Sequence, residues 1–415
     1  MRIAVYHNQP SGGATRATHE LGSYLARDHE VDVFTLETSG ESFLPSDYAR
    51  SLRVFPYAIR QPVRRGLYLN EWRRFQNLRD LDGVCARVAA TIDDGAYDAV
   101  FVSACRFVSG PCVLRYLQTP SVYYCHEPPR RFLERECHPN AGPVGLYRRL
   151  HGIWHRPAES LLGRAVARHD LENVESAGTL LTNSRYTQGV IAGYYGREAA
   201  VCYLGVDTGR WLPASPASGR PYVLSVGALE HHKGFDFLIP ALAQIPAVER
   251  PRLVIISNAA NPYMKRHMER LAESHGVDLA LLGGLSDDEV VALYQGAKAF
   301  VYSSHHEPFG LVVLEAMASA LPVVAVAEGG VRESVVDGVT GYLTSRDEPA
   351  FAEALSRLLK DPEQARRMGA EGRARAETEW TWEATGRRVG GALEEAAKAA
   401  APVDVPARGL ADVAS

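Results

Sequence analysis

The sequence predicts an α/β protein of two domains, each a parallel sheet with helices on both faces. Short β-branched runs alternate with helical patterns along most of the chain, which is typical of such sheets. The length of 415 residues exceeds what one hydrophobic core ordinarily serves. A Pro-rich segment near the middle separates two halves of similar size. Each half is therefore expected to form its own Rossmann-like domain.

The first half contains short strands separated by longer helices. β-branched and aromatic residues predict strands at 2–6, 31–36, 98–103, 121–125 and 179–182. Helical periodicity predicts a helix at 14–27 and long helical segments within 71–93 and 144–173. This order favours parallel strands joined by helical crossovers.

The second half restarts the same alternation. Strands are expected at 222–226, 252–256, 279–282, 299–302 and 322–326, with a helix between each pair. Open parallel sheets bind ligands beyond the carboxyl ends of their strands. The ligand-binding loops of the two domains should therefore face each other across a cleft.

The domain boundaries follow from local composition. The segment before Pro221 is too rich in Pro to sustain a helix or a central strand, and Trp380 and Trp382 need a surface to bury against. We expect an N-terminal Rossmann-like domain at 1–207, a linker at 208–221, a C-terminal Rossmann-like domain at 222–378, a helix at 379–400 that packs back towards the N-terminal domain, and a flexible tail at 401–415.

Composition excludes several classes of protein. With 45 Lys and Arg against 49 Asp and Glu, the formal charge of −4 argues against bulk nucleic-acid binding. The six Cys show no metal-ligand spacing, and the N-terminus lacks the apolar core of a signal peptide. The apolar stretch 311–327 contains Glu315 and Pro322 and is better divided into a helix and a strand than taken as a membrane span. We therefore expect a reduced, cytoplasmic protein.

The most informative segment begins at the expected strand 299–302 and passes through a polar loop into a helix at Gly310. Unpaired amides and the positive end of the dipole at such a helix start favour an anion, and phosphate is the usual one. Glu307 precedes these amides and Glu315 lies one turn into the helix. Because carboxylates repel phosphate, these two suit hydroxyl groups on either side of it, such as those of a sugar and a ribose.

Glu307 and Glu315, with seven residues between them, resemble the Glu-x7-Glu motif of the retaining nucleotide-sugar glycosyltransferases of family four, which have the two-domain GT-B fold. The Pro-Phe-Gly after the first Glu and the Ala-Met-Ala after the second also match. The resemblance implies that Glu307 holds hydroxyls of the donor sugar and that Glu315 holds the ribose. It also implies that the amides of Phe309, Gly310 and Leu311 hold sugar and phosphate oxygens.

A second motif follows the first strand of the C-terminal half. The eight residues from Gly227 resemble the family's Gly-Arg-Leu-x3-Lys-Gly motif, with Lys233 in place and Ala228 where the family has Arg. The resemblance implies that Lys233 neutralises the donor diphosphate, whose departure requires stabilisation of its developing charge. With Ala228, a second cation must come from elsewhere, from Arg130 or Arg332, or the leaving-group site is weaker. The nucleotide base would rest near Leu285, and its identity stays open.

In the N-terminal half, Gly12 and Gly13 join the first strand to the first helix. Glycine lets a backbone approach a ligand closely, and a helix start favours an anion. The loop is not GxGxxG, so a nicotinamide dehydrogenase is poorly supported. The resemblance implies that this pair lies against the donor phosphate and the acceptor.

A Pro-Pro pair ends the strand that carries Tyr124 and should leave His126 at the rim of the cleft. His126 resembles the family's strand-end His near the reacting centre. With Lys233 and Glu307 it makes up the expected catalytic set, while Tyr124 and Arg130 are expected to bind the acceptor.

Arginines gather in two stretches of the N-terminal half. Residues 50–79 hold eight Arg against one acid, and residues 130–168 hold eight against three, both interleaved with aromatic residues. These cations suit an acidic or phosphorylated acceptor, or an anionic bilayer that carries a lipid-linked acceptor. We favour peripheral association with the inner face of the cell membrane.

Asp80 and Asp82 have the spacing of a metal-binding DxD motif, but they fall inside a helical run rich in Arg. A solvated helix face accounts for them better, so no metal is expected, and no cofactor beyond the nucleotide sugar. Lys233 and helix amides would then do the electrostatic work of a metal ion.

Together these observations predict a retaining, metal-independent transferase that moves a hexosyl group from GDP-mannose or a UDP-hexose to a hydroxyl of a glycan or lipid-linked acceptor. A nucleotide-sugar epimerase or hydrolase of the same fold is one alternative. A non-catalytic nucleotide-sugar-binding protein is another, because of Ala228.

Overall fold

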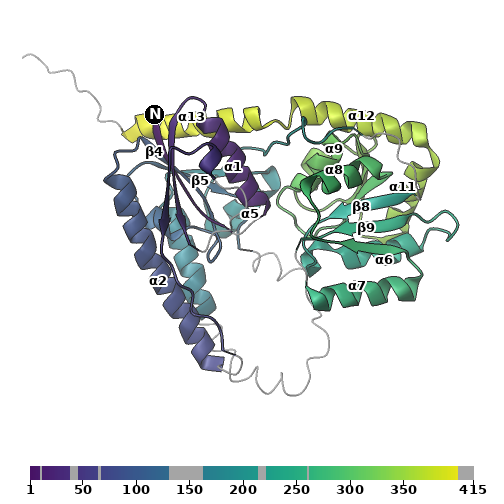
Figure 1. Cartoon of the computed structure of the whole chain (residues 1–415), viewed down its shortest axis with the longest axis horizontal. Helices are drawn as coiled ribbons and strands as arrows, with labels where there is room; N and C mark the ends of the chain where they lie inside the picture. The colour runs from purple at the N-terminus through teal and green to yellow at the C-terminus, as the bar shows by residue number, and fades with distance from the viewer. Residues whose placement is uncertain are drawn as a thin grey trace, which may run out of the picture.

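The computed structural model describes residues 1–9, 12–37, 45–63, 67–129, 162–213, 221–258 and 261–400. Over these residues the chain forms two α/β domains, one built around each of two parallel sheets (Figure 1). The predicted fold class is confirmed. Arg130, most of the segment 144–173, the middle of the linker and the tail at 401–415 lie outside the described residues.

The N-terminal sheet has seven parallel strands in the order β3-β2-β1-β4-β5-β6-β7. Its strands are β1 (Arg2–Asn8), β2 (Glu30–Leu36), β3 (Ser51–Phe55), β4 (Ala99–Cys105), β5 (Ser121–Cys125), β6 (Thr179–Thr182) and β7 (Ala200–Val201). All residues of β4 and β5 are buried, as expected for central strands covered by helices on both faces.

The C-terminal sheet has six parallel strands in the order β10-β9-β8-β11-β12-β13. Its strands are β8 (Tyr222–Val226), β9 (Arg252–Ile256), β10 (Leu279–Leu282), β11 (Ala299–Tyr302), β12 (Val323–Val326) and β13 (Gly341–Thr344). The sequence analysis found the central strands of both sheets and missed β3, β7 and β13. These three lie at sheet edges, where short and partly exposed strands carry little apolar pattern.

Helices cover both faces of each sheet (Figure 1). The N-terminal domain contains α1 (Gly13–Leu25), α2 (Leu67–Asp93), a helix that includes 162–175 and α5 (Arg185–Tyr195). After the linker follow α6 (Phe235–Ala243), α7 (Pro262–His275), α8 (Asp287–Gly296), α9 (Leu311–Ala318), α10 (Val331–Ser334), α11 (Glu348–Lys360), α12 (Pro362–Thr378) and α13 (Trp382–Ala400). Short 3-10 turns occur at Pro45–Asp47, Cys112–Arg115 and His231–Lys233.

The apolar stretch 311–327 forms α9 and then β12, as predicted. No helix in the described ranges has both the length and the apolar character needed to cross a membrane.

The C-terminal helix lies along the N-terminal domain, against α1, while α12 stays with the C-terminal domain (Figure 1). Val389 and Leu393 of α13 are fully buried in one cluster with Leu21 and Leu25 of α1. The sequence analysis expected one helix over 379–400, whereas the structure ends α12 at Thr378 and starts α13 at Trp382.

The break between α12 and α13 is held by two buried tryptophans. Trp380 packs against Tyr203 and Phe309, with ring centroids 5.0 and 5.7 Å away. The backbone of Trp382 packs so closely against Gly205 that a Cβ on Gly205 would overlap it. The chain therefore crosses back to the N-terminal domain through a packed joint.

Close approach of α13 to α1 depends on glycine. A Cβ at Gly386 would overlap the ring of Tyr24, whereas one at Gly391 on the same helix would meet nothing within 4 Å. We predict that Gly386→Ala lowers the free energy of unfolding by about 1–3 kcal/mol through overpacking. Gly391→Ala should be neutral or stabilising by up to about 1 kcal/mol because alanine favours the helix. Thermal denaturation of both variants checks this, and equal melting temperatures would contradict it.

Candidate active site

The start of α9 is a helix N-terminus shaped by glycine. Gly310 has a φ of 89°, in the left-handed region that other residues rarely adopt, and a Cβ there would lie 3.1 Å from the Tyr302 hydroxyl. Among the described residues, no side chain caps this helix start. The amides that follow Gly310 therefore keep the geometry of an anion site.

Lys233 and Glu307 meet beside this helix start. The Lys233 Nζ lies 2.7 Å from the Glu307 carboxylate, and both side chains are less than one-fifth exposed. Lys233 follows β8 in a short turn that ends at Gly234, whose Cβ position is blocked by the carbonyl of Ser303. The two motifs found in the sequence are thus brought together at the carboxyl edge of the C-terminal sheet.

The backbone of Glu307 packs directly on Gly329 and Gly330. The Gly330 amide donates to the Glu307 carbonyl at 2.9 Å, and a Cβ on either glycine would overlap the backbone of Glu307 or Pro308. The glycine pair therefore positions the loop that carries the first acid.

Glu315 is buried, and both of its carboxylate oxygens have partners. The Tyr294 hydroxyl donates to Oε2 at 2.9 Å, and Nη1 of Arg16, from the N-terminal domain, donates to Oε1 at 2.5 Å. Sequence reasoning missed both partners. Arg16 lies in the first turn of α1, three residues after Gly13, and that proximity was the only signal for it in the sequence.

The predicted glycine loop of the N-terminal domain faces α9. A Cβ on Gly13 would lie 3.4 Å from Cδ1 of Leu311, so the first residues of α1 and α9 are in contact across the domains. Two helix starts, each with a positive dipole end, therefore converge on the same region.

Further contacts tie the Glu307 loop to α5. The Ser184 hydroxyl donates to the Pro308 carbonyl at 2.6 Å. The carboxylate of Glu333 accepts the backbone amides of Arg185 and Tyr186, each at 2.9 Å. Both sets of contacts join the domains, and neither could be read from one stretch of sequence.

His126 follows the last residue of β5, and its side chain is buried. Its Nε2 lies 3.3 Å from the Ser103 hydroxyl, which accepts a hydrogen bond from Thr18 of α1. Burial lowers the pKa of His126 to about 4, so its ring is neutral at pH 7. His7, at the end of β1, is buried in the same way, and its pKa is also lowered to about 4.

The other predicted site residues fall in different places. Tyr124 is fully buried and its hydroxyl donates to the Cys202 carbonyl, a placement that does not support acceptor binding. Gly227 follows β8, close to the side chain of Lys233. Leu285 is half-buried just beyond the end of β10, and Arg332 is exposed on α10.

Asp80 and Asp82, the two acids of the DxD spacing on α2, have different partners. Asp80 bonds Arg60, and Asp82 accepts the Tyr116 hydroxyl at 2.7 Å. Over the part of the chain that the structure describes, no cluster of His, Cys, Asp and Glu is arranged to hold a metal ion.

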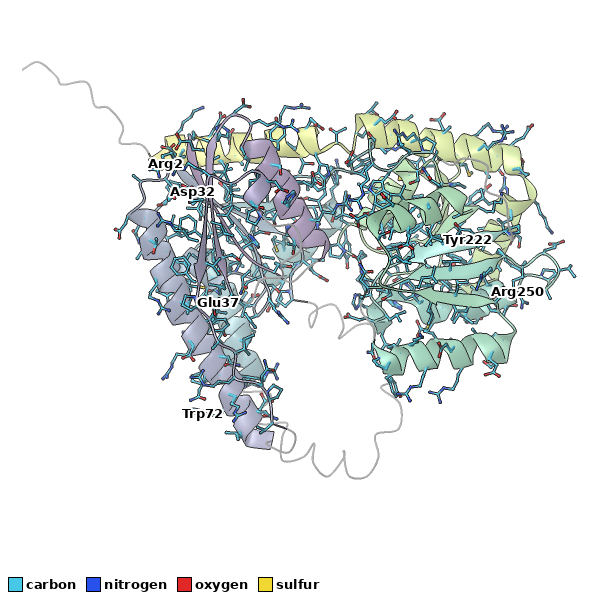
Figure 2. All side chains as sticks on the ribbon, in the orientation of Figure 1. Arg2, Asp32, Glu37, Trp72, Tyr222 and Arg250 are labelled. Carbon is cyan, nitrogen blue, oxygen red and sulfur yellow. The ribbon has the colours of Figure 1, made fainter. Side chains whose placement is uncertain are left out.

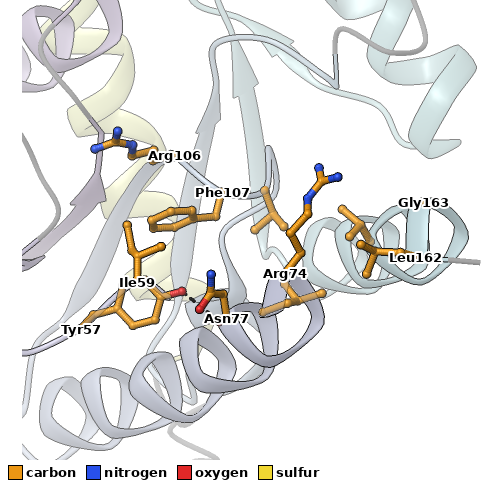
Figure 3. Close-up of a pocket in the computed structure, with 11 residues that line it drawn as sticks. Tyr57, Ile59, Arg74, Asn77, Arg106, Phe107, Leu162 and Gly163 are labelled. Atoms are coloured by element: carbon orange, nitrogen blue, oxygen red, sulfur yellow. Dashed lines mark hydrogen bonds between the residues drawn. The ribbon is translucent and has the colours of Figure 1, made fainter. Parts of the chain in front are cut away.

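A cavity of about 280 Å³ lies in the N-terminal domain between α2 and the helix that includes 162–175 (Figure 3). Tyr57 and Phe107 form an aromatic wall with ring centroids 5.4 Å apart, and the side chains of Arg74 and Arg106 also line it. An apolar floor with two guanidinium groups suits a ligand that is both apolar and anionic.

Comparisons with known proteins identify the family. The family model described as Glycosyltransferase Family 4 matches residues 11–210, and the model described as Glycosyl transferases group 1 matches residues 211–375. A GDP-mannose-dependent alpha-(1-6)-phosphatidylinositol monomannoside mannosyltransferase from Mycolicibacterium smegmatis is 33% identical over 273 residues, which is 60% of this chain and 70% of the relative. The chain belongs to glycosyltransferase family 4.

Solved structures agree with this assignment at the level of the fold. A sucrose-phosphate synthase from Thermosynechococcus elongatus superposes with a TM-score of 0.75 at 22% identity, covering 96% of this chain and 100% of that one. Anabaena HepE in complex with UDP and glucose gives 0.70 at 19% identity, covering 95% and 100%. The family 4 chain therefore has the GT-B fold that the resemblance implied.

The buried histidines predict a specific pH dependence. Their pKa values of about 4 lie below the value of 6.5 for an exposed histidine, so the unfolded chain binds more protons between these pH values. The stability that they contribute is present above pH 6.5 and is lost as the pH falls towards 4. Asp32 and Glu328, whose pKa values are lowered to about 2 from 3.8 and 4.5, lose their contribution to stability mainly below pH 4.5.

We predict that His126→Gln weakens the fall in melting temperature between pH 7 and pH 5, because one of the two buried histidines no longer titrates. His275→Gln, a change on the exposed last turn of α7, is the control and should keep the wild-type slope. Differential scanning calorimetry at several pH values measures both. An unchanged slope in His126→Gln would show that the protonation of His126 is not coupled to folding.

Proposed function

We propose that this family 4 enzyme is a retaining, metal-independent hexosyltransferase. It would move a hexosyl group from GDP-mannose or a UDP-hexose to a hydroxyl of a glycan or lipid-linked acceptor. The observation that supports this most directly is the Lys233–Glu307 pair beside the uncapped start of α9. This arrangement places a cation, helix amides and a hydroxyl-binding acid at the edge of the sheet where ligands bind.

In this proposal the diphosphate lies on the amides of Gly310 and Leu311, with the charge of Lys233 alongside. When Lys233 pairs with the phosphate instead of with Glu307, the Glu307 carboxylate accepts hydrogen bonds from hydroxyls of the donor sugar. Glu315 accepts the ribose hydroxyls, and Leu285 lies beside the base. Phe309 contributes an amide, while its ring stays buried against Trp380.

The transfer step needs no protein nucleophile. The bond from the anomeric carbon to the phosphate oxygen breaks, and a bond to the acceptor oxygen forms on the same face of the sugar. The proton of the acceptor hydroxyl passes to the leaving phosphate. Lys233 and the amides stabilise the charge that develops on that phosphate, which is the usual role of preorganised donors. His126, being neutral, would supply a hydrogen bond and not a charge.

The names of two similar proteins indicate which nucleotide sugars are candidates for the donor. The mannosyltransferase relative is named as GDP-mannose-dependent, and the HepE structure contains UDP and glucose. A thermal-shift comparison of UDP, GDP and ADP separates these options, because a ligand that binds only the folded state raises its melting temperature.

We predict that the nucleotide that stabilises the wild type binds Lys233→Ala about 10- to 100-fold more weakly, because a charge-assisted contact to phosphate is lost. Lys298→Ala, at an exposed lysine of the same domain, is the matched control and should keep wild-type affinity. Isothermal titration calorimetry measures both. Equal affinity of Lys233→Ala and the wild type for the nucleotide would refute the proposed diphosphate site.

A separate measurement tests the kind of reaction. Release of free sugar from the donor at full rate without acceptor would favour an epimerase or hydrolase.

We further propose that the enzyme is cytoplasmic and meets a lipid-linked acceptor at an anionic membrane surface. Trp72 lies towards the end of α2 remote from α13 (Figure 2). Its ring stacks on that of Phe75, and the two side chains are 57% and 41% exposed. Exposed aromatic residues flanked by Arg are suited to a negatively charged bilayer. The cavity lined by Arg74 of α2 and by Arg106, which follows β4, would receive the acceptor.

We predict that the wild type sediments with vesicles containing anionic phospholipid at low salt and that the double change Trp72→Ser and Phe75→Ser reduces this binding about tenfold. Val248→Ser, at a residue 96% exposed in the other domain, is the control. Vesicles of neutral phospholipid test the part played by charge. Failure of the wild type to sediment with either kind of vesicle would refute the membrane proposal and leave the donor site untouched.

A further inference from the structure

The Arg16–Glu315 ion pair joins the two domains within the candidate site. Nη1 of Arg16 lies 2.5 Å from Oε1 of Glu315, and the side chains are 15% and 9% exposed. In a pair this well shielded from water, loss of one partner leaves the other as an uncompensated buried charge. The contact is therefore a built feature of the site.

Aromatic residues hold both partners in place. The Arg16 guanidinium lies over the ring of Trp211, 5.9 Å from its centroid, and Trp211 packs edge-on against Tyr294 at 4.8 Å. Tyr294 in turn donates to the other oxygen of Glu315. Arg16 is thus positioned by a residue of the interdomain segment as well as by the acid.

The position of Glu315 puts Arg16 within reach of the diphosphate site. Leu311 and Glu315 are four residues apart on α9, about 6 Å along the helix axis. Because Gly13 contacts Leu311, the first turn of α1 lies alongside the first turn of α9. A rotation of the long Arg16 side chain would carry its guanidinium from Glu315 towards the amides that follow Gly310.

The charges of the site also require a second cation. Each acid has its own basic partner in the structure, Glu307 with Lys233 and Glu315 with Arg16. A nucleoside diphosphate brings at least two negative charges to this region, and position 228 is Ala. Of the cations considered from sequence, Arg332 is exposed on α10 and Arg130 lies outside the described residues.

We propose that Arg16 is the second cation of the donor site. Its guanidinium pairs with Glu315 in the structure, and it turns to the diphosphate when ribose hydroxyls take its place on Glu315. This inference rests on the proposed function, because it assumes a nucleoside diphosphate on α9. It gives the N-terminal domain a direct charge contact with the leaving group.

The test compares nucleoside diphosphate with the matching monophosphate. Isothermal titration calorimetry is carried out on the full chain with UDP or GDP, whichever stabilises it, and with UMP or GMP. We expect Arg16→Gln to weaken diphosphate binding at least tenfold and monophosphate binding at most about twofold, and Arg16→Lys to fall between Arg16→Gln and the wild type. Arg27→Ala, at an exposed side chain two residues beyond the end of α1, is the control and should bind as the wild type does.

Three results would overturn the inference. Unchanged diphosphate affinity in Arg16→Gln would show that Arg16 does not contact the phosphates. Tighter binding would show that Arg16 only competes with the ribose for Glu315, and equal weakening for both nucleotides would indicate a structural role. If Arg16→Gln does not fold, the ratio of diphosphate affinity to monophosphate affinity in Arg16→Lys is compared with the wild-type ratio instead.

The failure of this inference is distinct from the failure of the proposed function. A wild type that binds none of UDP, GDP or ADP would overturn both. A wild type that binds one of them, with an unchanged ratio in the Arg16 variants, would overturn only the role of Arg16.

Discussion

The candidate site depends on the close backbone packing of Gly329 and Gly330 against Glu307 and Pro308. No side chain fits between these segments, so the loop that leads into α9 has one available path. That path leads into the left-handed turn at Gly310, and no described side chain caps the helix start that follows. Contacts from α5 then hold the same loop from the other domain, so a single rigid segment carries both the anion site and the first acid.

Electrostatic balance explains how such a site tolerates two acids. Glu307 and Glu315 lie on either side of a helix start whose dipole already favours negative charge, and each acid is paired with a cation. In the proposed complex both cations would turn to the phosphates, and hydroxyls of the donor sugar and the ribose would hydrogen-bond the two carboxylates in their place.

Much of the fold could be predicted because its central strands are short, apolar and buried on both faces. The proximity of Lys233 and Glu307 could also be predicted from the sequence, since both follow strands that end at the same sheet edge. The role of Arg16 could not be predicted from the sequence, because its partner lies 299 residues away and the contact depends on how the domains meet. Tyr124 was misjudged for a related reason: in a strand covered on both faces, neighbouring side chains are all buried, so a residue near the strand end need not reach solvent.

The return of the chain at Trp380 also limits how the domains can move. The Val206 amide donates to the Trp380 carbonyl at 2.8 Å, so the outgoing and returning connections lie side by side. Two adjacent crossings define a pivot axis and oppose twisting about any other direction. Because α13 completes the hydrophobic face of α1, a fragment that ended before this helix would leave that face in water, and the N-terminal domain should be produced with residues 382–400 supplied to it.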